Sequence, residues 1–111
     1  AYCFVMDQGE RVGYFAILPD AERASMQLSK LYVKRAFRGR GVGRAVLAFI
    51  ERECAARGFR ELWLTVNKDN RDSIAFYQRQ GFVVDRPLNT DIGNGFVMDD
   101  HRMVKRLTIA M

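Results

Sequence analysis

The chain has 111 residues, of which 49% are hydrophobic and 28% charged, and this composition excludes disordered, collagen-like and coiled-coil proteins. Its length fits one domain over residues 1–111, and 18 Lys and Arg against 13 Asp and Glu give a net charge of +5. No segment approaches the roughly 20 apolar residues of a membrane span, and neither Cys3 nor Cys54 has a metal-ligand partner at the usual spacing. We therefore expect a soluble, cytoplasmic protein with free thiols, no metal and no membrane partner.

The first predicted elements are a β-hairpin and a third strand. Residues 1–7 and 11–18 are strand-like and flank Gln8-Gly9-Glu10, a short turn in which Gly9 suits a positive φ. Residues 20–24 form a polar turn after Pro19. Residues 25–33 alternate and then become continuously apolar, as in a strand that enters the middle of a sheet.

An amphipathic helix and a buried strand follow. Apolar residues recur every three to four positions, at Val42, Val46, Phe49, Ile50 and Cys54. Gly58 supplies the stop signal of this helix, and residues 62–66 then form a short buried strand.

The last third of the chain predicts a second helix and two strands. The helix begins near Ser73 and ends before Gly81, and residues 82–84 form a strand. We expect residues 87–95, which are rich in Asn, Asp and Gly, to be a loop, and residues 96–107 to be a final strand. The order ββ-β-α-β-α-β-β predicts a mixed α/β sheet with helices on its faces and one parallel strand pair.

The excess positive charge lies in one segment. Residues 34–44 contain five Lys and Arg and no acid, and the remaining basic and acidic residues balance. A general nucleic-acid binder more often spreads its basic residues along a face with aromatic residues between them. Here they surround Gly39, Gly41 and Gly43, which predicts one compact anion held close to the backbone and no nucleic-acid partner.

The glycine-rich motif Arg38-Gly39-Arg40-Gly41-Val42-Gly43 lies between a buried strand and a helix N-terminus. Such a junction presents unpaired backbone N–H groups and the positive end of the helix dipole, so it predicts a phosphate or pyrophosphate site. A flexible turn with solvated arginines is the alternative interpretation. A P-loop needs a Lys-Ser or Lys-Thr pair after the glycines, and a dinucleotide-binding GxGxxG needs a glycine at a position that falls on Arg44 or Val46.

The motif resembles the Q/R-x-x-G-x-G/A signature of the GNAT superfamily of N-acetyltransferases. Downstream, Asn67, Asn70, Ser73, Phe76-Tyr77 and Gly81-Phe82 resemble the family's N-x-x-N…A-x-x-F-Y-x-x-x-G-F pattern. The resemblance covers residues 1 to about 107. It implies a mixed, mostly antiparallel sheet in which strands 25–33 and 61–66 are parallel and splay apart. Family members have a further strand and helices ahead of the hairpin, so the resemblance also implies that this chain lacks its N-terminal part.

The resemblance implies acetyl-CoA as the acyl donor. In the family the backbone of the loop holds the pyrophosphate, the preceding strand pairs with the pantetheine arm, and the downstream polar residues lie along the cofactor. The residues that match these positions are Leu31, Tyr32, Val33, Arg38, Gly39, Arg40, Gly41, Val42, Gly43, Arg44, Asn67, Asn70 and Ser73, and Arg79 near the phosphoadenosine end.

The resemblance also implies the chemistry. Tyr77 matches the family's general acid, which protonates the coenzyme A thiolate after a neutral amine has attacked the thioester directly. A backbone N–H of Leu31 or a neighbour would stabilise the oxyanion. The alternative for Tyr77 is an amphipathic core tyrosine. Strand 25–33 offers no carboxylate, Glu22 suits a solvated turn and His101 a surface or structural role, so no general base is predicted.

Three functions stay open at this point. The first is an N-acetyltransferase whose acceptor is the amine of a small molecule or a protein, and which could form a homodimer through an exposed sheet edge. The second is a non-catalytic acyl-CoA-binding module of the same fold. The third, nucleic-acid binding through residues 34–44, is disfavoured because the patch is small and centred on glycines.

Overall fold

The computed structural model describes residues 2–93 and 96–107. Its elements follow the predicted order: β1 (Tyr2–Asp7), β2 (Glu10–Asp20), β3 (Ser25–Val33), α1 (Val42–Ala56), β4 (Glu61–Asn67), α2 (Arg71–Arg79), β5 (Val83–Gly93) and β6 (Phe96–Arg106). A short 3-10 helix, Arg35–Phe37, follows β3. The hairpin between β1 and β2 turns at Gln8 and Gly9, both with positive φ, and this confirms the predicted turn.

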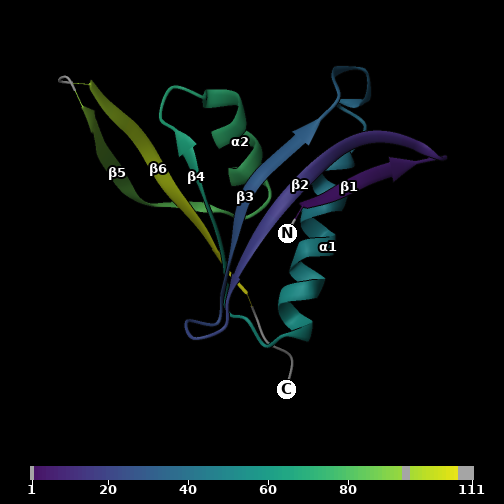
Figure 1. Ribbon diagram of the computed structural model, residues 1–111, viewed down its shortest axis with the longest axis horizontal. Coiled ribbons are helices and arrows are strands. Elements are labelled where there is room, and N and C mark those ends of the chain that lie inside the picture. The colour runs from purple at the N-terminus through teal and green to yellow at the C-terminus, as the bar shows by residue number, and fades with distance from the viewer. Residues whose placement is uncertain (1, 94–95, 108–111) are drawn as a thin grey trace.

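The six strands form one sheet in the order β1-β2-β3-β4-β6-β5. The parallel pair, β3 and β4, is joined through only three residue pairs, from Ser25 with Glu61 to Gln27 with Trp63. Beyond these pairs the strands diverge, and the sheet opens into one arm of β1–β3 and another of β4–β6, with α2 between them in the view of Figure 1. The predicted mixed sheet with a splayed parallel pair is therefore confirmed.

Both helices cover the same face of the sheet. Phe15 and Leu28 of one arm and Leu64 of the other belong to a single buried cluster with Ile50 of α1, and Tyr77 of α2 packs against it. This cluster fixes the position of α2 relative to both arms. Neither helix, in the part of the chain that the structure describes, has the length and apolarity needed to cross a membrane.

One residue that the periodicity assigns to the apolar face of α1 is exposed in the structure. Phe49 is 42% exposed, whereas its neighbour Leu47 is buried. The ring of Phe49 still touches the core, because it meets the edge of Phe15 with the ring centroids 6.1 Å apart. Residues at the border of a helical stripe are the ones that periodicity assigns least well, since a small rotation of the helix exchanges them.

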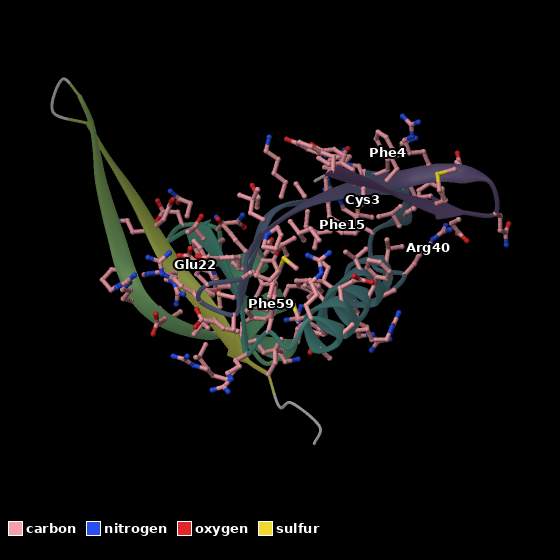
Figure 2. The ribbon with its side chains drawn as sticks, turned by 60° about the horizontal axis from the view of Figure 1, so that its bottom comes forward. Cys3, Phe4, Phe15, Glu22, Arg40 and Phe59 are labelled. Carbon is pink, nitrogen blue, oxygen red and sulfur yellow. The ribbon has the colours of Figure 1, made fainter. Side chains whose placement is uncertain are left out.

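The β1–β3 arm has a second face, which is exposed. Tyr2, Phe4 and Met6 of β1 are all more than half exposed. Figure 2 shows Phe4 on the side of the sheet away from α1, whereas Phe15 points toward α1. Tyr14 stands opposite Phe4 in the strand register and shares its face. We refer to this side of the sheet as the exposed face.

The predicted loop over residues 87–95 is wrong for the part that the structure describes. Residues 87–93 continue β5 and pair with β6, from Pro87 opposite His101 to Gly93 opposite Phe96. Residues 94–95 lie outside the described residues. Asn, Asp and Pro disfavour a central strand, but β5 is at the edge of the sheet and pairs on one side only, where Pro87 removes no needed donor.

Gly13 of β2 allows the close approach of β2 and β3 at the end of β3 that carries the predicted site. A Cβ atom at this position would lie 2.2 Å from the carbonyl oxygen of Tyr32, so the two strands would have to separate. We expect Gly13→Ala to lower the free energy of unfolding by about 2 kcal/mol, as overpacking does. Gly9→Asn is the matched control, because nothing lies within 4 Å of its Cβ and Asn tolerates the turn conformation. Denaturant unfolding of both variants tests this, and equal midpoints would contradict it.

Candidate functional site

The loop between β3 and α1 has the geometry of an anion site. Gly39 and Gly41 have φ of 77° and 82°, a conformation that favours glycine. Gly41 is the N-cap of α1 and offers no side-chain acceptor to the first N–H groups of the helix, and no acidic residue lies in the first turn. Backbone donors and the positive end of the helix dipole therefore remain available to an anion.

A cavity of about 610 Å³, here called the loop cavity, lies between this loop, the end of β3 and α2. Most residues that the sequence predicts for cofactor binding line it, together with Tyr77. They are Leu31, Tyr32, Val33, Arg38, Gly39, Gly41, Val42, Gly43, Arg44, Ser73 and Arg79. Sequence reasoning missed Phe37, Asp72 and Phe76 as lining residues.

Phe76 could have been found from its position beside Tyr77 in the Phe-Tyr pair. A Cβ atom at Gly43 would lie 3.1 Å from the ring of Phe76, so Gly43 lets α1 and α2 approach each other at the cavity wall. Phe37 is hidden in a short 3-10 helix, for which the sequence gives no signal.

The gap between the diverging β3 and β4 is a second cavity of about 280 Å³, here called the interstrand cleft. Leu31, Ser73 and Tyr77 line both cavities, so the loop cavity and the interstrand cleft meet at these residues. The register of β2 with β3 shifts between Ala16–Lys30 and Ile17–Leu28, which leaves Ser29 as an extra residue beside the cleft. Such a bulge leaves backbone groups of the strand outside the ladder.

Contacts between aromatic rings hold Tyr77 at this junction. It packs edge-on against Phe76 and Phe82, with ring centroids 5.2 and 5.5 Å apart. Burial raises the pKa of its phenol to about 12, because the charged phenolate is poorly solvated there. The hydroxyl therefore stays protonated at neutral pH and can donate a proton or a hydrogen bond.

The loop, the splayed strands and Tyr77 all lie within the part of the chain that a protein-family profile matches. The sequence profile of the acetyltransferase (GNAT) family matches residues 1–82. The chain belongs to the GNAT family. The sequence resemblance drawn from the loop and the Asn and Phe-Tyr patterns is thereby confirmed.

Individual relatives agree with this. The chain is 29% identical over 89% of its length to an uncharacterised N-acetyltransferase of Mycobacterium tuberculosis, of which it spans 62%. It is 29% identical to the ribosomal protein bS18-alanine N-acetyltransferase of Escherichia coli over 71% of this chain and 60% of that protein. The chain therefore spans less than two thirds of the length of these relatives.

Solved structures have the same fold. The structure of the E. coli ribosomal-protein-S18-alanine N-acetyltransferase superposes with a TM-score of 0.81, at 22% identity, over 100% of this chain and 71% of that chain. The PaiA N-acetyltransferase of Thermoplasma acidophilum, solved with coenzyme A, superposes with a TM-score of 0.77, at 23% identity, over 95% of this chain and 59% of that chain.

The two asparagines of the GNAT pattern line the interstrand cleft and also shape the chain. The Oδ1 atom of Asn67 accepts a hydrogen bond of 2.9 Å from the backbone of Asp69. Asn70 is the N-cap of α2, and its Oδ1 atom accepts a bond of 3.3 Å from the backbone of Ser73. Both side chains therefore hold α2, and with it Tyr77, at the end of β4.

The arginines of the loop have different surroundings. Arg38 donates from Nε to the carbonyl of Val33 at 2.9 Å, which ties the loop to β3. Arg44 lines the loop cavity. Arg40, also predicted for cofactor binding, is not among the lining residues, and its guanidinium lies 5.3 Å from the centre of the Phe37 ring.

No carboxylate or imidazole is among the residues that line the interstrand cleft in the described structure. Glu22 is in the turn after β2, at a separate cavity with Trp63 (Figure 2 labels Glu22). His101 lies in β6 opposite Val66, and its Nδ1 atom is buried without a hydrogen-bond partner among the described residues. Asp100 is opposite Asn67, one strand away from the cleft.

Proposed function

We propose that this chain transfers the acetyl group of acetyl-CoA to a primary amine of a small molecule or a protein, with Tyr77 as the general acid. The observation that carries the proposal is the meeting of the loop cavity and the interstrand cleft at Tyr77, Ser73 and Leu31. One cavity suits a long phosphorylated molecule, and the other gives its far end a route between two strands. The two free cysteines suit a reducing compartment, and we propose the cytoplasm.

The residues present fit the donor. The N–H groups of the glycine loop and the side chain of Arg44 would bind the pyrophosphate, and Arg79 would approach the phosphoadenosine. The edge of β3 from Leu28 to Tyr32 has no partner among the described strands on the side of the cleft, so the backbone groups that face the cleft there can bind the amides of the pantetheine arm. The coenzyme A in the T. acidophilum structure supports a donor of this class.

The catalytic roles that we propose for β3 and Tyr77 follow from their positions beside the interstrand cleft. Bound acetyl-CoA supplies a thioester, which an amine can attack directly. A backbone N–H of β3 beside the bulge at Ser29 would stabilise negative charge on the carbonyl oxygen. The phenol of Tyr77 would give its proton to the departing sulfur, and its raised pKa keeps that proton available. The nitrogen loses one proton as the amide forms, and a proton returned through water would restore the phenol.

The acceptor that we propose is a primary amine, and a relative suggests which kind to test first. The E. coli relative is named for transfer to an alanine of ribosomal protein bS18, which makes a protein amine a suitable first acceptor to test. A non-catalytic acyl-CoA-binding module is the second candidate, and the lack of a carboxylate or imidazole along the described cleft favours it.

Calorimetric titration with acetyl-CoA, with ATP and a short DNA duplex as controls, is the first test. We expect one-to-one binding of acetyl-CoA alone. Thiol release measured with a panel of peptide and small-molecule amines then separates the acetyltransferase from the binding module. Transfer to any amine supports the enzyme, and binding without transfer to the whole panel supports the module. A folded protein that does not bind acetyl-CoA contradicts both.

The two arginines of the loop give a sharper test of the cofactor site. Because Arg44 lines the loop cavity, we expect Arg44→Met to weaken acetyl-CoA binding about tenfold, the usual effect of losing one charge-assisted hydrogen bond. Arg40→Met removes the same charge from a side chain placed against Phe37, and we expect less than a threefold change. Calorimetry at one ionic strength measures both. Equal losses would mean that only net charge matters here.

A further inference from the structure

One side chain, Phe76 of α2, lies between the cofactor loop and Tyr77. On one side, the tip of its ring faces Gly43 in the first turn of α1. A Cβ atom at Gly43 would lie 3.1 Å from Cζ of that ring and 3.7 Å from both Cε atoms. On the other side, the ring packs edge-on against Tyr77, with the ring centroids 5.2 Å apart. The position of Tyr77 therefore depends on how closely α1 approaches Phe76.

The glycine at position 43 provides space and is not needed for backbone conformation. Gly39 and Gly41 have positive φ, whereas Gly43 is the second residue of α1 and does not. A glycine within a helix is unfavourable relative to alanine, because it loses more backbone entropy on folding. Alanine would therefore suit α1 better here, and the three atoms nearest to its Cβ would all belong to the Phe76 ring.

Of the two helices, α2 is the one more easily displaced when this contact tightens. Four residues of α1 are buried in the core, whereas no residue of α2 is buried to that degree. The nine residues of α2 are held mainly at the two ends. Asn70 caps the first turn, and Nζ of Lys105 donates a bond of 2.8 Å to the carbonyl of Gln80. A side chain added at position 43 would therefore push Phe76, and Tyr77 with it, away from α1.

We propose that Gly43 is a positioning residue for Tyr77. Its missing side chain sets the distance between α1 and Phe76, and this distance fixes the Tyr77 hydroxyl where the loop cavity meets the interstrand cleft. The inference rests on the proposed acetyltransferase function. A general acid must lie within hydrogen-bond reach of the atom that it protonates. A Cβ contact of 3.1 Å is a few tenths of an ångström too short, so Phe76 would have to shift by about that much.

The first variant to measure is Gly43→Ala. Its rate of acetyl transfer at saturating acetyl-CoA should fall about tenfold, since a misplacement of about 1 Å can cost 100-fold and this one is smaller. Its affinity for acetyl-CoA should stay within threefold of the wild type, because the added methyl group faces Phe76 and the backbone N–H remains. Its denaturation midpoint should stay close to the wild type, because the gain in helix propensity offsets the tight contact. A loss of rate without a loss of stability separates positioning from packing alone.

Two double variants test whether the effect passes through Phe76 and Tyr77. Leucine in place of Phe76 removes the tip of the ring, so Gly43→Ala should cost less than twofold in rate when it is added to Phe76→Leu. It should also cost less than twofold when it is added to Tyr77→Phe, because the hydroxyl that it would displace is already absent. Such non-additive effects are typical of residues that act through one another.

Ala48→Gly is the matched control. Ala48 is exposed on α1, so this variant exchanges the same two residue types in the same helix. It lines neither the loop cavity nor the interstrand cleft, and it lies five positions after Gly43, on a different side of the helix. We expect its denaturation midpoint to fall and its transfer rate to stay within twofold of the wild type.

Several results would overturn the inference. One is a Gly43→Ala protein that keeps the wild-type rate. Another is a tenfold loss that persists when Gly43→Ala is combined with Phe76→Leu or with Tyr77→Phe. A loss of acetyl-CoA affinity as large as the loss of rate would assign Gly43 to cofactor binding alone. An equal loss of rate in Ala48→Gly would assign the effect to the stability of α1.

Failure of the proposed function has a different signature. In each of the results above, the wild type still transfers acetyl groups, so only the role of Gly43 is lost. A wild type that binds acetyl-CoA but acetylates no amine of the panel overturns the acetyltransferase activity, and this inference with it, and leaves the cofactor site in place. A wild type that does not bind acetyl-CoA overturns the cofactor site as well. Calorimetry with acetyl-CoA on the same preparations therefore accompanies the rate measurements.

Discussion

Replacing Tyr77 with phenylalanine should slow acetyl transfer about 100-fold, the smaller end of what a positioned general acid contributes. The change removes the hydroxyl and keeps the ring, so the edge-on contacts with Phe76 and Phe82 are retained. Since the loop cavity is lined mainly by other residues, the affinity for acetyl-CoA should stay within twofold of the wild type. Steady-state rates of thiol release and calorimetric titration with acetyl-CoA measure the two quantities.

Tyr14→Phe is the matched control. Tyr14 also loses a hydroxyl, but its ring is on the exposed face and it lines neither the loop cavity nor the interstrand cleft. We expect its rate to stay within twofold of the wild type. Thermal unfolding of both variants shows whether packing is preserved. A Tyr77→Phe protein that folds, binds acetyl-CoA and keeps its rate would remove Tyr77 from catalysis and leave it as a core residue.

Much of the fold was predictable because its signals are local. The positive φ at Gly9 and Gly58, the three-to-four periodicity of α1 and the glycine loop each depend on a few adjacent residues. The length of β5 was not predictable in this way. Residues 87–93 are poor strand formers and pair with β6 because the partner strand and the edge position permit it. Tertiary pairing of this kind leaves no trace in a short window of sequence.

The two cavities of the candidate site also differ in how well the sequence predicts them. The anion cradle could be predicted because glycines and arginines are adjacent in sequence, and eleven of the fourteen residues predicted for cofactor binding line the loop cavity. The interstrand cleft could only be implied by resemblance, since it depends on where β3 and β4 stop pairing. The bulge at Ser29 depends on strand register, which composition and periodicity do not give.

The pH dependence of the rate is the second large effect that we expect. No carboxylate or imidazole lines the described cleft, so the protein offers no group there that would accept the proton of an ammonium ion. The acceptor must then arrive as the neutral amine. Below the pKa of the amine, the neutral fraction rises tenfold per pH unit, so the rate at subsaturating acceptor should rise about 100-fold from pH 5 to pH 7 for a peptide α-amine of pKa about 8.

The midpoint of this rise should belong to the acceptor and not to the enzyme. A lysine ε-amine, with a pKa of about 10.4, should shift the midpoint upward by more than two pH units relative to a peptide α-amine. No fall in rate should follow below pH 10, because burial raises the pKa of Tyr77 to about 12 and the phenol keeps its proton throughout. Rates for both amines between pH 5 and pH 10 check these expectations, because within this range the α-amine profile should level off whereas the ε-amine profile should still rise at pH 10.

A midpoint shared by both amines would mean that a side chain accepts the proton. His101 and Asp100 are the groups to examine in that case, since they pair with Val66 and Asn67 at the end of β4. A shared midpoint that disappears in His101→Asn would assign the histidine, and one that disappears in Asp100→Asn would assign the carboxylate. Either outcome would replace direct deprotonation by solvent with a relay that reaches the cleft across β4.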